Sequence, residues 1–292
     1  MPTLDLPRIR RLTADDLGDA LALSTAAGWN QQLADWALLL ALSSRGACAA
    51  EHDGRVVGTA LAIDYGGFAW IAMMLVESGW RGRGLGARLL EAALAAVPAG
   101  LPVRLDATEA GRSLYRRHRF QDEDRLTRLV APAARPRHEP TRTVEVRAMT
   151  SADLPAIARR DAKVFGGTRR AAMAWALEQA PQYALMIDAP GRPPQYCIGR
   201  PGRRFDQIGP VVADSDASAA ALTGAGLARA EGRAVVVDAF DARTHFGAWL
   251  HAAGFSAERP LFRMCRPAHG SSNAAVPPGS LHQYAILGPD FA

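Results

Sequence analysis

The spacing of hydrophobic positions along the first half of the chain predicts alternating strands and helices. Apolar residues recur with the helical period in some stretches and with the strand period in others, and glycine or aspartate stands at the turns between them. The predicted elements are a strand at 9–12, helices at 14–26 and 32–43, three strands within 47–76, a helix at 85–96, a strand ending at 106, a short helix from 111 and a strand at 125–130. Turns at Asp53-Gly54 and Gly66-Gly67 make the three central strands an antiparallel meander.

The chain repeats itself at a domain-sized period, which indicates a duplicated fold. FQDEDRLTRLVAP at 120–132 aligns without gaps with FSAERPLFRMCRP at 255–267. The identical pairs are Phe120 with Phe255, Glu123 with Glu258, Leu126 with Leu261, Arg128 with Arg263 and Pro132 with Pro267. A predicted strand that ends in aspartate, Asp106 or Asp238, precedes each copy. The alternative is two chance matches between strand-and-turn segments.

The repeat divides the chain into two domains, predicted at 1–132 and 144–292. The stretch between them, 133–143, is rich in proline and arginine and is typical of an extended linker. Each half is expected to hold a mixed, mostly antiparallel sheet flanked by helices, so the predicted fold class is α/β (α+β).

Composition, apolar run lengths and cysteine count indicate where the protein is found, but they say little about its activity. Of the 292 residues, 49% are hydrophobic and 22% charged, which is ordinary for a folded chain. The N-terminal MPTLDLPRIR lacks the apolar core of a signal peptide, and the longest apolar run, WALLLAL at 36–42, is far shorter than the ~18 residues of a membrane span. Cys48, Cys197 and Cys265 are too few and too scattered for a disulfide framework. We therefore expect a cytoplasmic protein with no membrane partner.

The net charge of +5 suggests nucleic-acid binding, but the distribution of charge argues against it. Residues 1–132 contain 15 arginines and 15 acidic residues, so this half is neutral. No dense basic block is interleaved with the aromatic residues that single-strand binders use for stacking. We expect no nucleic-acid partner.

The stretch VESGWRGRGLGARLLEAAL at 76–94 places Gly82, Gly84 and Gly86 at the start of a predicted helix. Glycines there let the backbone approach a phosphate without Cβ atoms in the way. Gly82, Gly84 and Ala87 fit a dinucleotide-binding fingerprint, with Asp106 as the ribose ligand, but that loop normally follows the first strand of its domain. Here two helices and a three-stranded meander come first, which makes this interpretation the weaker of two.

The spacing Arg81-x-x-Gly84-x-Gly86, with the predicted order of elements, resembles the GNAT superfamily of N-acetyltransferases. The resemblance implies a splayed sheet in each half. It also implies that the loop amides and the helix N-terminus in the first half hold the pyrophosphate of acetyl-CoA. The implied cofactor-binding residues are Met74, Leu75, Val76, Arg81, Gly82, Arg83, Gly84, Leu85, Gly86 and Ala87. A backbone amide near 74–76 is expected to meet the oxyanion.

The stretch LDATEAGRSLYRRHRF at 105–120 is similar to the second GNAT signature, in which a short helix carries a tyrosine below the thiol of the cofactor. The resemblance makes Tyr115 the catalytic acid that protonates the departing thiolate. The residues alone allow another role for Tyr115, as a core aromatic beside Leu114.

AGWNQQLADW at 27–36 and YAILGPDFA from Tyr284 are similar to a subgroup of tandem GNAT proteins with a divergent C-terminal domain. In the GNAT fold the connection between the first two helices overlies the acceptor side, so the resemblance makes Trp29, Asn30 and Gln31 substrate-binding residues. Trp29 offers a flat face to a cation, and the two amides offer donors and acceptors. Packing and capping of the two helices are the alternative roles.

The second half departs from the pattern where it would hold the cofactor. Its counterpart of the loop, IGPVVADSDASAAAL at 208–222, has no Arg-x-x-Gly-x-Gly, and Asp214 and Asp216 bring negative charge to the expected phosphate position. We therefore expect residues 144–292 to form a degenerate GNAT-like domain without acetyl-CoA, which helps to wall the acceptor cleft of the first domain.

These features together favour an acetyl-CoA-dependent N-acetyltransferase that moves an acetyl group directly to a primary amine of a small molecule or peptide. A non-catalytic acyl-CoA-binding module and, with less support, a dinucleotide-binding oxidoreductase are the alternatives. A homodimer is compatible with this interpretation. No general base stands out: the candidates are Asp35, Asp64 and Glu109, each of which also reads as a solvated surface acid. No metal is expected, because Cys48/His52 and Cys265/His269 lack the further ligands of a structural zinc.

Overall fold

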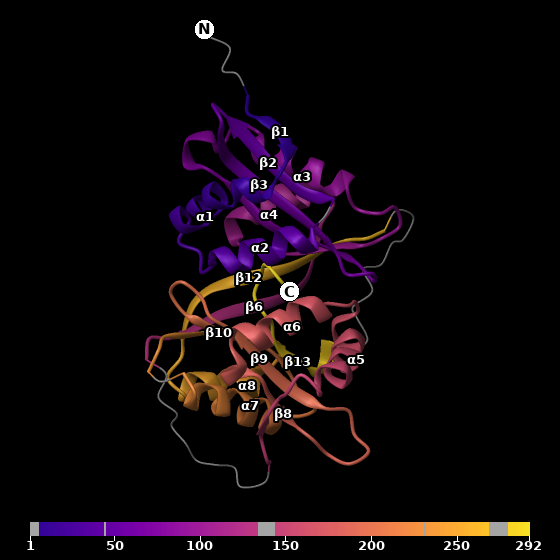
Figure 1. The fold of residues 1–292 in the computed structure, drawn as a ribbon, viewed down its shortest axis with the longest axis vertical. Helices are drawn as coiled ribbons and strands as arrows, with labels where there is room; N and C mark the ends of the chain where they lie inside the picture. Colours follow the sequence, from indigo (N-terminus) through magenta and orange to yellow (C-terminus); the bar gives the residue numbers. More distant parts are fainter. Residues whose placement is uncertain (1–5, 44, 134–143, 231, 269–279) are drawn as a thin grey trace.

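The computed structural model describes residues 6–43, 45–133, 144–230, 232–268 and 280–292. In the first half it confirms the order of elements predicted from the sequence (Figure 1). These elements are β1 (Arg8–Arg11), α1 (Leu17–Ala26), α2 (Leu33–Leu42), β2 (Gly46–His52), β3 (Arg55–Asp64), β4 (Ala69–Val76), α3 (Leu85–Ala95), β5 (Val103–Ala107), α4 (Glu109–Arg117) and β6 (Gln121–Ala131), with 3-10 turns at Ala14–Asp16 and Ser78–Trp80.

The second half follows the same order and then adds one strand, β13. Its elements are β7 (Arg147–Ala148), α5 (Leu154–Phe165), α6 (Arg170–Gln179), β8 (Leu185–Ile187), β9 (Gln195–Arg200), β10 (Asp206–Val212), α7 (Asp216–Ala228), β11 (Val235–Phe240), α8 (Thr244–Ala252), β12 (Ser256–Arg266) and β13 (Gln283–Ala285), with 3-10 turns at Pro181–Tyr183 and Ser280–His282. Except for Ala133, the predicted linker at 133–143 lies outside the described residues.

Helices cover both faces of the first half's sheet. Successive strand residues point to opposite sides of a sheet, so two neighbouring residues of β3 show which helix covers each face. Leu89 of α3 is buried in one hydrophobic cluster with Ala60 of β3, while Trp36 of α2 is buried in another cluster with the next residue of β3, Leu61. The apolar face of α3, formed by Leu85, Leu89 and Leu90, is therefore the face that the helix turns to the sheet.

All the described strands belong to one continuous sheet of 13 strands, in the order β1-β2-β3-β4-β5-β12-β6-β11-β13-β10-β9-β8-β7. Most neighbours are antiparallel, and the pairs β4–β5 and β10–β11 are parallel. The predicted fold class, a mixed and mostly antiparallel sheet flanked by helices in each of two tandem units, is confirmed.

The two halves exchange their long terminal strands across the middle of the molecule (Figure 1). β12, from the second half, lies between β5 and β6 of the first half, so that Phe262 faces Ala107 on one side and Arg125 on the other. In the same way β6, from the first half, lies between β12 and β11 of the second. Each half thus completes the sheet of the other.

Two buried ion pairs cross this exchange and correspond to each other in the sequence repeat. Arg263 of β12 binds Asp106 of β5, with both N–O distances 2.9 Å. Arg128 of β6 binds Asp238 of β11 at 2.7 and 2.8 Å. Each arginine binds the aspartate of the other half. The arginine and the aspartate that the sequence repeats therefore form equivalent ion pairs in the two halves.

The two halves also share hydrophobic core. One cluster of buried side chains contains Phe68 and Trp70 from β4 and its turn together with Phe165 and Phe291 from the second half. Backbone atoms meet there as well, since the amide of Thr168 donates to the carbonyl oxygen of Tyr65 at 2.8 Å. The halves therefore pack as one body.

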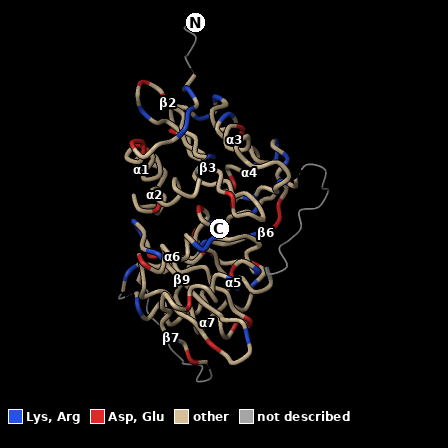
Figure 2. The backbone as a smooth tube through the Cα atoms, turned by 45° about the vertical axis from the view of Figure 1, so that its right-hand side comes forward, with Lys and Arg blue, Asp and Glu red and all other residues tan. Residues whose placement is uncertain are grey.

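Charged residues of both signs are interspersed over both halves (Figure 2). None of the helices in the described ranges has the length and apolar character needed to cross a bilayer.

Candidate active site

The parallel strands β4 and β5 diverge and open a cleft in the sheet of the first half. They pair only at Ala69 with Val103 and at Trp70 with Arg104. Beyond these pairs the two strands border a cleft of about 650 Å³, its open mouth included. The lining residues are Trp29, Asn30, Gln31, Ile71, Ala72, Met73, Met74, Leu105, Asp106, Thr108, Tyr115, Arg128, Arg259, Leu261, Pro289 and Asp290.

A β-bulge turns the backbone of β4 toward this cleft. Thr59 of β3 faces Leu75, but Leu61 faces Ala72, so two residues of β4, Met73 and Met74, stand opposite one residue of β3. Met73 has a φ of 52°, which is rare for a residue with a side chain. The bulge interrupts the ladder at the place where the sequence predicts an oxyanion-binding amide.

The glycine-rich loop joins β4 to α3, as predicted. Gly82 and Gly84 have φ values of 74° and 79°, in the left-handed region that favours glycine, and an added Cβ at either would find no atom within 4 Å. Arg81 donates from Nε to the carbonyl oxygen of Val76 at 2.9 Å and so fastens the loop to the end of β4. The first amides of α3, which have no intrahelical partner, follow Gly84 directly.

Of the predicted cofactor-binding residues, Met74 lines the cleft, and the loop at 81–87 follows at the end of the same strand. Tyr115, on α4, lines the cleft from the side of β5 and is 8% exposed. Burial raises the pKa of its hydroxyl above the ordinary value. A tyrosine held protonated in this way can donate a proton but does not spontaneously ionise near neutral pH.

The segment Trp29-Asn30-Gln31 lies on the same cleft. Asn30 binds the second half through three hydrogen bonds: its Oδ1 accepts from the amides of Arg204 and Phe205 at 2.8 and 3.0 Å, and its Nδ2 donates to the carbonyl oxygen of Phe205 at 2.9 Å. Asn30 therefore holds the wall of the cleft in place: the three bonds use both lone pairs of Oδ1 and one of the two N–H groups of Nδ2.

A segment at the end of the described chain crosses from the second half to this cleft. Tyr65 and Trp70 of the first half donate to the carbonyl oxygens of Phe291 and Pro289, both at 3.1 Å. These bonds place Asp290, a cleft-lining carboxylate, beside β4.

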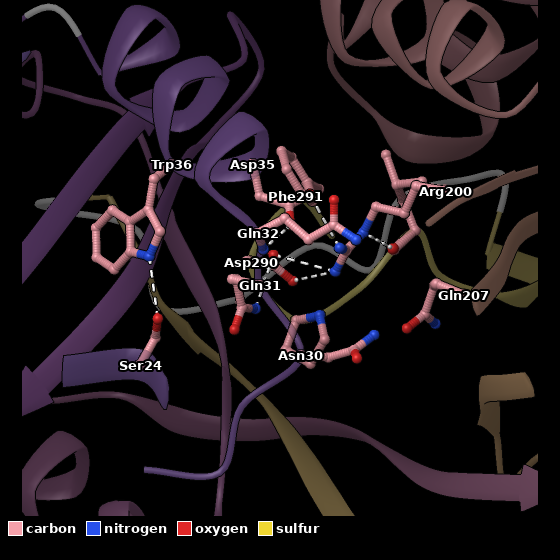
Figure 3. Close-up of polar contacts among 12 residues, drawn as sticks. Ser24, Asn30, Gln31, Gln32, Asp35, Trp36, Arg200, Gln207, Asp290 and Phe291 are labelled. Carbon is pink, nitrogen blue, oxygen red and sulfur yellow. Dashed lines mark hydrogen bonds and ion pairs between the residues drawn. The ribbon is translucent and has the colours of Figure 1, made fainter. Parts of the chain in front are cut away.

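Asp290 belongs to a buried polar network that joins the halves (Figure 3). Arg200 of β9 binds Asp35 at 3.0 Å and Asp290 at 3.2 Å. Gln31 donates from Nε2 to Asp290 at 3.0 Å. Two carboxylates thus share one guanidinium, and the network ends at the cleft.

The three candidate general bases all lie outside the cleft lining. Asp64 accepts the amide of Gly66 in an exposed turn, and Glu109 pairs with Arg112 on the surface. The alternative interpretation of Asp35 as a solvated surface acid is wrong, because the side chain is buried and paired with Arg200. Burial raises the pKa of Asp35 to about 6 despite the opposing charge of Arg200.

The far wall of the cleft comes from the exchanged strands, and the local sequence does not mark its residues as cleft residues. Arg128 of β6 and Arg259 of β12 are cross-strand neighbours, and both line the cleft with Leu261. The sequence marks Asp290 only as part of the stretch from Tyr284 that resembles the tandem GNAT subgroup, and not as a cleft residue. The strand exchange brings Arg128, Arg259 and Leu261 to the cleft, and the segment after β13 brings Asp290.

In the second half the opening that corresponds to this cleft is filled. β10 and β11 also separate after two residue pairs. There Ala285 of β13 pairs with Val211 of β10 and with Ala239 of β11. A Cβ added to Gly209 would lie 2.0 Å from the carbonyl oxygen of Ile286, so the chain end packs directly on β10. β13 therefore pairs with backbone groups that the separation of β10 and β11 leaves without a partner.

The acidic residues that follow β10 have structural roles. Asp214 forms an ion pair with Arg160 at 2.6 Å, and its carboxylate lies 3.0 Å from Nδ1 of His282. Asp216 begins α7, where its charge suits the helix N-terminus. Neither an open splay nor a glycine loop stands at this place.

A sheet that splays after a bulged strand, followed by a glycine loop that opens a helix, defines the GNAT class of fold. Two stretches, residues 43–122 and 157–275, match models of the acetyltransferase (GNAT) domain. The chain belongs to the GNAT acetyltransferase family and carries two such domains in tandem. Members of this family transfer acetyl groups from acetyl-CoA. No group of three or more potential metal ligands occurs among the described residues.

Solved structures share the whole architecture. A candidate acetyltransferase from Pyrococcus horikoshii is 21% identical, with a TM-score of 0.77, and the match covers 99% of this chain and 97% of that one. A GCN5-related N-acetyltransferase from Sphaerobacter thermophilus is 16% identical, with a TM-score of 0.63 and coverage of 89% and 95%. A tandem GNAT protein from the clavulanic acid biosynthesis pathway is 16% identical, with a TM-score of 0.62 and coverage of 92% and 100%. These likenesses establish the fold. The comparison with curated proteins finds no match.

Proposed function

We propose that the protein is an N-acetyltransferase that transfers the acetyl group of acetyl-CoA directly to a primary amine, in the cleft between β4 and β5. The observation that carries the proposal is the convergence on one cleft of a bulged strand, a buried tyrosine and the α1–α2 connection. The glycine loop at the end of the same strand supplies a place for the pyrophosphate.

In the proposed reaction the amine nitrogen attacks the thioester carbonyl carbon, the C–N bond forms and the C–S bond breaks. The bulge takes Met73 and Met74 out of the regular register of the ladder, and a backbone amide there stabilises the oxyanion. Tyr115 gives its proton to the departing thiolate. The attacking nitrogen loses one proton to solvent or to a cleft carboxylate, and the phenolate of Tyr115 takes up one proton from solvent.

The dinucleotide alternative fits the geometry less well. Asp106, which would have to bind a ribose, already accepts hydrogen bonds from Nε and Nη2 of Arg263. A ribose hydroxyl would have to compete with a buried, two-point charged pair.

The test is an assay of free CoA release with acetyl-CoA and a panel of amines. Turnover of at least one amine supports the transferase. Binding of acetyl-CoA without turnover of any amine would instead support the non-catalytic acyl-CoA-binding module.

Gly84→Val is expected to abolish measurable acetyl-CoA binding in calorimetric titration. The β-branched side chain cannot adopt the left-handed φ of 79° without strain, and it fills the space where a phosphate would approach. Gly100→Val is the matched control, because Gly100 has a φ of 87° and equally open surroundings but lies outside the loop. Equal affinity in both variants and the wild type would contradict the assignment of the loop.

Titration of the intact chain is expected to show one acetyl-CoA per chain. The second half lacks the glycine loop, and β13 fills its splay. Calorimetric stoichiometry measures this directly. A stoichiometry of two in the wild type, falling to one in Gly84→Val, would overturn the proposal that residues 144–292 are degenerate.

A further inference from the structure

Two polar atoms are buried without a hydrogen-bond partner, within the described chain, on residues that line the acceptor cleft. One is Nε of Arg259, a cationic donor on β12. The other is Oε1 of Gln31, an acceptor in the α1–α2 connection. Buried polar atoms are nearly always paired, so an unpaired donor and an unpaired acceptor on one cleft indicate a ligand that supplies both partners.

Arg259 carries a positive charge that no ion pair neutralises within the described ranges. Its cross-strand neighbour Arg128 is held by both oxygens of Asp238, so that carboxylate is already used. Burial lowers the pKa of Arg259, and the charge of Arg128 lowers it further, while Asp238 and Glu258 act in the opposite direction only at a distance. A guanidinium in this position is stabilised by an anion that enters from the cleft.

The charge at Arg259 is not a remnant of the duplication. Position 124 of the first half corresponds to position 259 in the gapless alignment, and it holds aspartate. The cation therefore occurs in β12 and not at the matching position of β6, although residues of both strands line the cleft.

The opposite wall of the cleft has a surplus of negative charge. Asp290 and Asp35 share the single guanidinium of Arg200, which leaves one negative charge unbalanced when both are ionised. Gln31 donates its amide N–H to Asp290, so the orientation of the amide is settled and Oε1 is left as the free acceptor. These groups lie beside β4, because Trp70 binds the carbonyl oxygen of Pro289.

We propose that the acceptor is a zwitterion, a primary amine with a carboxylate on the same small molecule, as in an amino acid. Arg259 binds the carboxylate, and Gln31 and Asp290 receive the amine beside the bulge of β4, where the thioester carbonyl is expected. The separation of the charges across the cleft orients the molecule with its amine toward the reacting carbon.

A carboxylate matches this site better than a phosphate. The far wall offers one unpaired guanidinium, since Arg128 is already neutralised by Asp238. One positive charge balances a carboxylate monoanion, whereas a phosphate dianion would leave a buried negative charge without a partner.

This inference rests on the proposed function, but a binding measurement separates the two. The probes are three matched pairs: L-lysine with cadaverine, L-ornithine with putrescine and L-phenylalanine with phenethylamine. For each pair kcat/KM is measured from CoA release at pH 8, and affinity is measured by calorimetry with CoA present. The proteins are the wild type, Arg259→Met, Arg259→Lys and the control Arg125→Met, which removes an exposed arginine from the neighbouring strand.

The wild type is expected to favour the carboxylate-bearing member of at least one pair. Arg259→Met should lower its kcat/KM and affinity about 10–100-fold, through KM, and leave the decarboxylated member unchanged, because a hydrogen-bonded charge is lost. Arg259→Lys should retain part of the preference for the carboxylate-bearing member. Arg125→Met should change neither kcat/KM nor affinity. If Arg259→Met does not fold, the inference is tested by comparing Arg259→Lys with the wild type in kcat/KM and affinity for the carboxylate-bearing member.

The outcomes separate the two ideas. The inference would be overturned if simple amines are acetylated and Arg259→Met does not change the ratio of kcat/KM between the two members of each pair. The proposed transferase would then still stand. Zwitterion binding that depends on Arg259 without any turnover would support the inference and count against the transferase. The absence of Arg259-dependent binding for every carboxylate in the panel would overturn the inference.

Discussion

Tyr115→Phe is expected to lower kcat by about 10²–10⁴-fold, the usual contribution of general acid catalysis. The hydroxyl is buried on the cleft, and its raised pKa keeps it protonated throughout the pH range of an assay. Phenylalanine preserves the ring, which packs at 5.9 Å from the ring of Phe120, so the fold should be unaffected. Single-turnover kinetics at saturating acetyl-CoA and acceptor measure the chemical step directly.

The matched control is Tyr183→Phe, which also removes a buried hydroxyl, one that donates to Asp206 in the second half. It should lower stability by about 1.5–3 kcal/mol, because the acceptor is a carboxylate, and leave kcat within a few-fold. A Tyr115→Phe variant with a wild-type chemical step would show that this ring only packs. Unchanged affinity for acetyl-CoA in Tyr115→Phe would show that the loss is in the reaction and not in cofactor binding.

Local signals in the sequence were sufficient for the order of the elements and for the position of the glycine loop. Helix and strand periods depend on neighbours within a few residues, and the loop needs glycine at left-handed positions such as Gly84. The sequence also led to Tyr115 and to residues 29–31, all of which line one cleft. These are the features that a single domain of the fold determines by itself.

The strand exchange could not be predicted in the same way. β6 and β12 are copies of one strand, so either could pair with β5 on the basis of its own pattern. Arg128 and Arg263 are likewise equivalent, and each could reach Asp106 or Asp238. Only the packing of the whole chain selects between the two arrangements, and with it the arginines that line the cleft.

The role of Asn30 depended on the same long-range packing. In the sequence it is a polar residue in a helix connection, suited to a substrate. In the structure a turn of the second half closes over it so tightly that a Cβ on Gly202 would lie 2.1 Å from its Nδ2. The second domain is thus fastened to the acceptor side of the first through Asn30, and it reaches the cleft itself through Asp290.

Because of the exchange, a chain that ends at Pro132 is expected to be insoluble or unfolded, although it contains the whole first repeat. Removal of β12 exposes the inner edges of β5 and β6 and deletes Leu261, Met264 and Cys265, which are at most 1% exposed. Unpaired central strand edges template aggregation, and the lost burial of such side chains costs roughly 1.5–3 kcal/mol each. Against a typical total stability of about 5–15 kcal/mol, the loss is too large for the first repeat to remain folded.

The same reasoning predicts that residues 1–133 and 144–292, expressed together as separate chains, form a soluble one-to-one complex. Each fragment supplies the strand that completes the other's sheet, so the peptide connection is not required for pairing. Size-exclusion chromatography with light scattering measures the assembly, and calorimetry measures whether acetyl-CoA affinity is retained. Omission of 256–266 from the second fragment is the matched control and should abolish the complex. A soluble 1–132 fragment that unfolds cooperatively and binds acetyl-CoA as tightly as the full chain would contradict this prediction. It would show that the first domain folds and binds the cofactor without β12.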